Sequence, residues 1–120
     1  MPKDIYTLQK RSKVWGASNA PDSTSRTTWK HLREEFLDEL QPAITLLEDQ
    51  LKTDPNALRM LTQKRMAAVA EEMADQIILL AQLANKYGID LDSATWIKWK
   101  KVEARRYVKG DDGVYRHVKE

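Results

Sequence analysis

Two pairs of carboxylates have types and spacing in this chain that could support chemistry. Glu72 and Asp75 lie three residues apart, directly before an apolar run at residues 77–80. Because residues i and i+3 share a helix face, both side chains should point the same way. Glu35 and Asp38 repeat this spacing on an earlier amphipathic segment. If the two helices pack, the four carboxylates meet in one oxygen-rich site of the kind that Mg²⁺ prefers.

A solvated acidic helix surface is the competing interpretation, because charged side chains are mostly exposed. Two observations favour a site. Asp is a poor residue for a helix interior, yet Asp38 and Asp75 both fall within predicted helices. Glu72 and Asp75 also adjoin apolar positions, where a charge is costly to bury unless it is paired, protonated or bound to a cation. A di-iron bundle would need Glu-x-x-His pairs, which the sequence lacks.

Aromatic and polar residues near the start of the chain are candidates for binding a base. Trp15 adjoins a polar segment at residues 16–27 and is the tryptophan best placed to stack on a base. Asn19 in that segment offers both a donor and an acceptor to a base edge. His31 precedes Glu35 by four residues and could contact its carboxylate. A core or interface role for the tryptophan and a plain surface histidine are the alternatives.

A basic stretch near the end of the chain is a candidate for binding phosphate. Five basic residues and one acidic residue occur between Lys98 and Arg106. Lys98, Lys101 and Arg105 fall on one helix face, and arginine can give a bidentate contact to phosphate. Alternatively, these cations only complement the partial negative charge at a helix C-terminus.

Apolar periodicity predicts an all-α chain. Helices are expected over residues 5–15, from Thr27 or Thr28 to Pro42, over 43–51, over 54–87 and from Asp90 onward. The expected apolar positions are Ile5, Leu8 and Val14; Trp29, Leu32, Phe36 and Leu40; Ile44, Leu47 and Leu51; Leu58, Leu61, Val69, Met73, Ile77, Leu80 and Leu83; and Ala94, Ile97 and Val102.

Local signals set the expected ends of these elements. Residues 16–27 should form a loop, and Pro42 should kink or break its helix. Asp54 and Pro55 match an N-cap followed by a first-turn proline. Gly88 suits the position after a helix C-terminus, and Asp90 should cap the last helix. The Gly-Asp-Asp-Gly turn at 110–113 predicts a small hairpin between residues 107–108 and 114–115.

Composition excludes several classes of protein. The chain has 120 residues, which suits one domain, and no cysteine, so disulfides, thiolate zinc sites and a cysteine nucleophile are excluded. A net charge of +2 disfavours a nucleic-acid coating protein. No apolar run approaches the roughly 18 residues that a membrane span needs. Since no signal-peptide core is visible either, we expect a cytoplasmic protein with no membrane partner.

Five motifs follow one another over about residues 5–107, namely Leu8-Gln9 with Trp15, Glu35-x-x-Asp38, Glu71-Glu72-x-x-Asp75, Tyr87-Gly-Ile-Asp-Leu-Asp92 and Lys98-x-x-x-Val102-x-x-Arg105. In order and spacing they resemble the MazG-type all-α nucleoside triphosphate pyrophosphohydrolases, which are similar to the dCTP pyrophosphatases and the dimeric dUTPases. The chain also departs from the family. Asp38 and Val102 replace the usual glutamate and asparagine, and Arg106 separates Arg105 from Tyr107.

The resemblance implies a MazG-like bundle of four to five helices that forms a homodimer or homotetramer. Residues 1–107 would be the pyrophosphohydrolase domain and 108–120 a C-terminal tail or hairpin. The implied activity is metal-dependent hydrolysis of a (d)NTP at the α-phosphorus to (d)NMP and pyrophosphate. Trp15 and the polar segment favour a purine, for example guanine, while a pyrimidine and either sugar stay open.

The resemblance also implies roles for particular residues. Mg²⁺, for which Mn²⁺ could substitute, would be bound by Glu35, Asp38, Glu72 and Asp75. Glu35, Glu34 or Glu39 would accept the proton of the attacking water. Lys98, Lys101 and Arg105 would stabilise charge on the phosphates, and Trp15 and Asn19 would bind the base. The alternative is a non-catalytic helical dimer that acts as an adaptor or regulator, with its carboxylates merely solvated.

Overall fold

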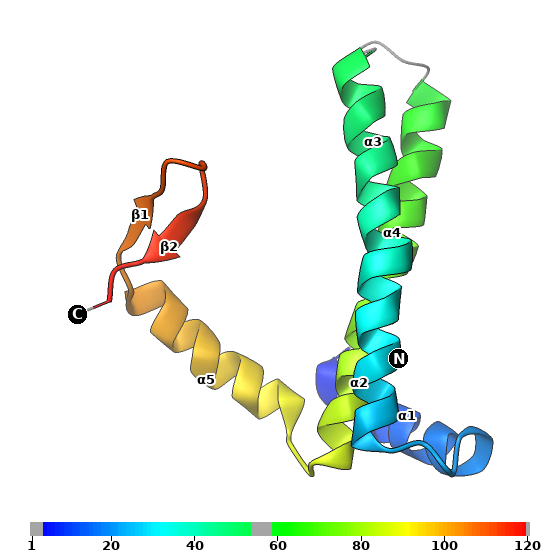
Figure 1. Cartoon of the computed structure of the whole chain (residues 1–120). Helices are drawn as coiled ribbons and strands as arrows, with labels where there is room; N and C mark the ends of the chain where they lie inside the picture. The colour runs from blue at the N-terminus through cyan, green and yellow to red at the C-terminus, as the bar shows by residue number, and fades with distance from the viewer. Residues whose placement is uncertain (1–3, 54–58, 120) are drawn as a thin grey trace.

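The computed structural model describes residues 4–53 and 59–119, and it is helical apart from one small hairpin (Figure 1). The elements in order are α1 (Ile5–Asn19), α2 (Ser25–Glu34), the π-helix η1 (Glu35–Leu40), α3 (Gln41–Thr53), α4 (Arg59–Lys86), α5 (Leu91–Ala104), β1 (Tyr107–Lys109) and β2 (Tyr115–His117). Figure 1 shows α2, η1 and α3 as one continuous rod that runs beside α4. Contacts from α1, α2, η1 and α3 all converge on α4, so α4 is the central helix.

The first helix is longer than predicted. Asp4 caps α1 by accepting a 2.6 Å hydrogen bond from the Thr7 N–H. The helix then continues past Trp15 and Gly16 to Asn19. Part of the predicted loop at 16–27 is therefore helical, because Gly16 can adopt helical dihedrals and nothing at 17–19 prevents the next turn. The true connection is a short segment at residues 20–24.

The second helix begins earlier than predicted because Thr24, and not Thr27 or Thr28, is its N-cap. The Thr24 hydroxyl accepts from the Thr27 N–H at 3.2 Å, and the Thr27 hydroxyl accepts from the Thr24 N–H at 2.9 Å. This reciprocal pair satisfies two backbone donors that would otherwise lack partners at the helix start.

Pro42 does not break the helix, contrary to one of the two outcomes predicted for it. Proline lacks an N–H and its ring crowds the carbonyl four residues earlier. Here the π-helix η1 directly precedes α3, and the Gln41 N–H bonds to the Phe36 carbonyl five residues back. Because a π-turn is wider than an α-turn, the chain passes Pro42 without losing its helical path.

The junction between α4 and α5 follows the sequence signals. Gly88 has φ of +66°, the left-handed value expected after a helix C-terminus, and Asp90 caps α5 by accepting from the Ser93 N–H at 3.2 Å. Both predictions are confirmed. The buried side chain of Gln9 ties this junction to α1: its amide donates to the Ile89 carbonyl and accepts from the Leu91 N–H. The predicted cap at Asp54 and Pro55, and the apolar position at Leu58, lie outside the described residues.

The core is small and lies between α4 and the elements around it. The buried apolar residues among those described are Leu32, Leu40, Val69, Leu79, Ala81 and Ala84. Several predicted core positions are instead between 44% and 72% exposed, namely Val14, Trp29, Phe36, Leu51, Leu61, Met73, Ile77, Leu80 and Ile97. On α4, the elements packed against the helix bury Val69 but leave Leu61, Met73, Ile77 and Leu80 largely exposed.

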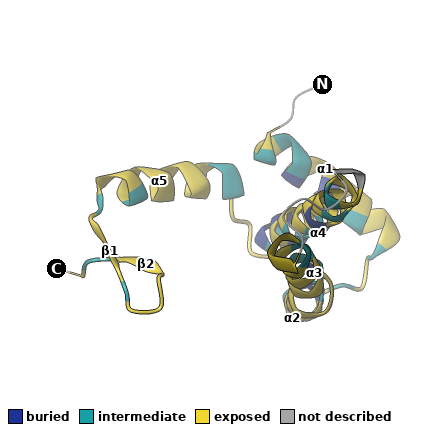
Figure 2. Ribbon diagram, turned by 90° about the horizontal axis from the view of Figure 1, so that it is seen from above, coloured by how far each residue is buried: buried dark blue, intermediate teal, exposed yellow. Residues whose placement is uncertain are grey.

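The last helix and the hairpin stand apart from the rod (Figures 1 and 2). Among the described helices, α5 packs mainly against α1, and nearly all of its surface is exposed in Figure 2. None of the helices in residues 4–53 and 59–119 combines the length and the apolar character needed to cross a bilayer.

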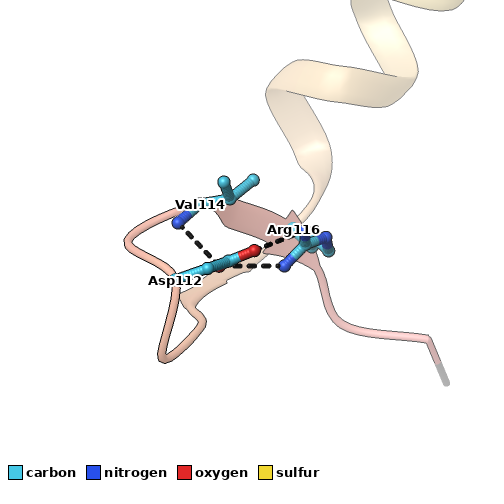
Figure 3. Close-up of polar contacts among 3 residues, drawn as sticks. All are labelled: Asp112, Val114 and Arg116. Atoms are coloured by element: carbon cyan, nitrogen blue, oxygen red, sulfur yellow. Dashed lines mark hydrogen bonds and ion pairs between the residues drawn. The ribbon is translucent and has the colours of Figure 1, made fainter.

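The predicted hairpin is confirmed, with Tyr107 paired to His117 and Lys109 paired to Tyr115. Val114 precedes β2 and is not part of it. In Figure 3 the Asp112 carboxylate accepts from the Arg116 guanidinium at 2.9 Å and from the Val114 N–H at 3.0 Å. These hydrogen bonds favour the charged carboxylate and lower the pKa of Asp112. The expected boundary after residue 107 falls inside β1, and the division into domain and tail stays a prediction.

Candidate functional site

Three of the four predicted metal ligands converge where η1 packs against α4. Glu35 of η1 and Glu72 and Asp75 of α4 each contribute a carboxylate oxygen, and these oxygens lie within 4.8 Å of one another. All three residues are half-buried. The predicted contact with His31 is also present, because its Nε2 lies 3.2 Å from the Glu35 carboxylate. We refer to Glu35, Glu72 and Asp75 as the carboxylate cluster.

Glu72 has the environment of a metal ligand. Its Oε2 is buried and has no hydrogen-bond partner among the described residues. Loss of water around the carboxylate raises the pKa of Glu72, and the negative charges of Asp75, Glu39, Glu35 and Glu71 raise it further. A buried oxygen that lacks a donor and faces like charges is costly. A bound divalent cation would remove both costs, so the donor set fits a hard metal ion.

The fourth predicted ligand, Asp38, lies outside the cluster. It is exposed and lines a separate hollow of about 280 Å³ together with Lys30, Arg33, Glu34 and Leu37. The physical reason is the π-helix. The i to i+3 rule assumes an α-helix, whereas one turn of η1 is longer by about a residue. Glu39 is therefore the residue that follows Glu35 on the side of α4, and its charge acts on Glu72.

A cavity of about 680 Å³ extends from the cluster along α4. Glu35 and Asp75 line one end of it. The other lining residues are Ser12, Lys13, Trp15, Gly16 and Ala17 of α1; Ala20, Pro21 and Ser23 of the connection; Thr27, Thr28 and His31 of α2; and Ile78, Leu79, Gln82, Asn85 and Lys86 of α4. Its volume falls in the range of small-molecule and cofactor sites.

The two predicted base-binding residues differ in where they lie. Trp15 lines the cavity and is 54% exposed. Asn19 does not line it, and its side-chain amide donates to the Trp15 carbonyl at 2.9 Å. Sequence reasoning missed Gln82 and Asn85, which follow Asp75 by seven and ten residues. Those intervals return to the same helix face, so continuing the search along α4 would have found them.

The basic residues fall into two groups. Lys13 and Lys86 line the cavity, and the Lys86 ammonium donates to the Ser23 carbonyl at 2.7 Å, which ties the connection to α4. The predicted phosphate ligands do not line the cavity: Lys98 and Lys101 lie on α5, and Arg105 directly follows its last residue. Within one chain the predicted cations are thus separate from the carboxylates.

Fold and site together describe a helical bundle with a candidate divalent-metal centre at one end of an elongated cavity. No protein-family model matches the sequence, and no curated protein matches it. Among solved structures, the chain is similar to a cyanophage S-2L MazG-like pyrophosphohydrolase bound to dGDP and three catalytic Mn²⁺ ions per active site. The sequences are 26% identical, the match covers 100% of this chain and 98% of the other, and the TM-score is 0.62. The chain has the MazG-like all-α fold, as the sequence motifs indicated.

Proposed function

We propose that this protein is a metal-dependent nucleoside triphosphate pyrophosphohydrolase that converts a (d)NTP to (d)NMP and pyrophosphate. The observation that carries the proposal is the convergence of Glu35, Glu72 and Asp75 at one end of a cavity. The similar cyanophage enzyme supports it, because that protein binds a nucleotide and divalent metal ions.

The carboxylate cluster would hold the metal. Glu35, Glu72 and Asp75 supply hard oxygen ligands, and we propose Mg²⁺ as the physiological ion, with Mn²⁺ able to replace it. When bound, the metal neutralises triphosphate oxygens and lowers the pKa of the attacking water. His31 would orient Glu35 through its contact with that carboxylate. Asp38 is assigned no role in metal binding, since it lies in the other hollow.

Glu39 is our proposed general base among the three predicted candidates. Glu34 is exposed and lies 4.0 Å from the Lys30 ammonium, in the hollow that contains Asp38. Glu35 belongs to the carboxylate cluster, where its oxygens would bind the metal and not accept a proton. Glu39 lies close enough to Glu72 to affect its pKa, yet it is not one of the three residues whose oxygens converge. It is therefore the free carboxylate that can accept the proton of a water attacking the α-phosphorus.

Phosphate binding would draw on both groups of cations. Lys13 and Lys86 line the cavity and can contact a triphosphate from within the same chain. We propose that Lys98, Lys101 and Arg105 reach the phosphates from a second copy of the chain, in a homodimer or homotetramer. The exposed Trp96, Ile97 and Trp99 of α5 support this arrangement, because such an apolar surface is costly to leave in water.

The substrate base is proposed to be guanine. Trp15 offers an aromatic face at the edge of the cavity, where a base could stack. The cyanophage relative contains dGDP, which supports a guanine nucleotide as substrate of this chain too.

Product analysis with a full panel of NTPs and dNTPs in Mg²⁺ tests the reaction. Monophosphate and pyrophosphate should appear, and diphosphate and orthophosphate should not. A Glu72→Gln variant should be inactive with an unchanged helical circular dichroism spectrum, whereas Gln63→Glu, on an exposed part of α4, should be fully active. No turnover of any nucleotide with Mg²⁺ or Mn²⁺ would refute the enzymatic proposal and favour the adaptor.

A further inference from the structure

The end of the cavity remote from the carboxylate cluster contains four polar side chains that the proposed chemistry does not use. Ser12, Thr28, Gln82 and Asn85 line the cavity, and the first two are buried. We call these four residues the polar end. Since an α-helix rises about 1.5 Å per residue, Gln82 and Asn85 lie about 10 and 15 Å from Asp75 along α4. A nucleotide whose phosphates lie at the cluster would extend its base toward them.

On Ser12, Thr28 and Asn85, every side-chain hydrogen-bond donor is already engaged within the chain. The Ser12 hydroxyl donates to the Gln9 carbonyl at 2.9 Å, and the Thr28 hydroxyl donates to the Thr24 carbonyl at 2.8 Å. The Asn85 amide nitrogen donates both its hydrogens, to the Gln9 carbonyl at 3.0 Å and to the Ser12 hydroxyl at 3.2 Å. Lone pairs on the two hydroxyls and on the Asn85 carbonyl are all that remain for a ligand.

The orientation of the Asn85 amide is determined by its partners. The backbone carbonyl of Gln9 can only accept a hydrogen bond, and the Ser12 hydroxyl already donates its proton to that same carbonyl. If the amide were flipped, its oxygen would face two acceptors. The nitrogen must therefore face α1, and the oxygen is left as an acceptor on the other side.

Gln82 differs from the other three residues. It is half-buried, lines the cavity and makes no hydrogen bond to any other residue in the described ranges. It precedes Asn85 by three residues and so shares its helix face. The Gln82 amide is the one member of the polar end that can still donate a hydrogen bond to a base.

An end with several acceptors and one free donor discriminates among the bases. Guanine presents two adjacent donors, N1–H and the 2-amino group, next to one acceptor, O6. Adenine and cytosine each present one amino group beside acceptor atoms only, and uracil or thymine presents one N–H between two carbonyls. Only guanine places two neighbouring donors on one edge, so the other bases would leave acceptors of the polar end unpaired, which is costly when they are buried.

We propose that the polar end is the specificity-determining site of the enzyme. Ser12, Thr28 and Asn85 accept hydrogen bonds from guanine N1–H and the 2-amino group, and Gln82 donates to O6. This inference rests on the proposed function for the location of the base, and it adds the residues that select it. Trp15 at the mouth contributes stacking, which does not distinguish one base from another.

The first experiment compares kcat/KM for dGTP, dITP and dATP. Hypoxanthine lacks only the 2-amino group, so dITP should be poorer than dGTP by between about fivefold and a hundredfold, the effect of one unpaired buried acceptor. Equal kcat/KM values for dGTP and dITP would overturn the proposal.

The second experiment replaces the free donor. Gln82→Glu keeps the size of the side chain but turns its donor into an acceptor, so kcat/KM for dGTP should fall at least about tenfold. The dATP value should hold or rise, because adenine has an amino group at the position of O6. Gln63→Glu makes the same change on an exposed part of α4 and should alter neither value. Equal losses for dGTP and dATP in the Gln82 variant would refute the assigned role.

Binding distinguishes failure of this inference from failure of the proposed reaction. Thermal stabilisation by each nucleotide with Mn²⁺ requires no turnover. Preferential stabilisation by dGTP over dITP, lost in Gln82→Glu, would support the specificity site even in a chain that hydrolyses nothing. Stabilisation by no nucleotide, or the same stabilisation by all three, would overturn the inference.

Discussion

Replacing Glu39 and its neighbour Asp38 one at a time tests the geometry of η1 directly. Glu39→Gln preserves the shape of the side chain and removes its ability to accept a proton. Because general base catalysis is worth about 10²–10⁴-fold, kcat should fall by that factor, equivalent to about 2.7–5.5 kcal/mol in the activation barrier. KM should change little, since Glu39 is not one of the cluster residues.

Asp38→Asn is the matched control, because it makes the same kind of change one residue away. Asp38 is exposed and lies in the hollow with Lys30 and Arg33, so its charge is screened by solvent. We expect kcat and KM within about twofold of the parent protein, as for most exposed charges. A continuous α-helix through residues 35–40 would give the opposite result, with Asp38 essential.

Steady-state release of pyrophosphate measures both variants, and thermal stabilisation by Mn²⁺ separates catalysis from metal binding. Glu39→Gln should still be stabilised by Mn²⁺, because Glu35, Glu72 and Asp75 are intact. An active Glu39→Gln together with an inactive Asp38→Asn would refute the assignment of η1 and of the base. Loss of Mn²⁺ stabilisation in Glu39→Gln would make this residue a ligand and not a base.

Three further predictions concern the metal, a turn and the hairpin. Asp75→Asn should abolish turnover and Mn²⁺ stabilisation and leave the helical circular dichroism unchanged. Gly88→Ala should lower the free energy of unfolding by about 1–2 kcal/mol because φ is positive there, whereas Gly16→Ala within α1 should raise it by about 0.5–1 kcal/mol in urea denaturation. The pKa of Asp112 lies below its ordinary value of 3.8, so its contribution to hairpin stability is complete above that value and is lost as pH falls through the lowered pKa. Cross-strand NMR contacts between Val108 and Arg116 should disappear over that acid range, and should persist there if the carboxylate contributes nothing.

Local signals in the sequence predicted the parts of the fold that depend on neighbouring residues. Gly88 and Asp90 end one helix and start the next because φ preference and side-chain capping act within a few residues. Glu72 and Asp75 were placed correctly relative to each other because α4 is a regular α-helix. The hairpin was predictable for the same reason, from the turn residues between its strands.

Features that depend on packing were not predictable from these signals. A π-helix leaves no composition signal, so Asp38 was placed beside Glu35 by an α-helical rule that fails there. Apolar residues reveal that a face is apolar but not what covers it, so Met73 and Ile77 were assigned to the core of a chain that exposes them. The acceptor roles of Ser12 and Thr28 required knowledge of which carbonyls lie nearby.

The π-helix also sets how this chain can change over evolution. An α-helix turns by about 100° per residue, so η1 offsets the phase of α3 relative to α2 by roughly one residue. Deleting a single residue within 36–39 would let this wider turn close as an ordinary α-turn, so α3 would keep the face that it presents to α4. Over evolution the chain should therefore be able to lose one residue at this turn without losing its fold, so length should vary here more readily than in the α-helical turns on either side.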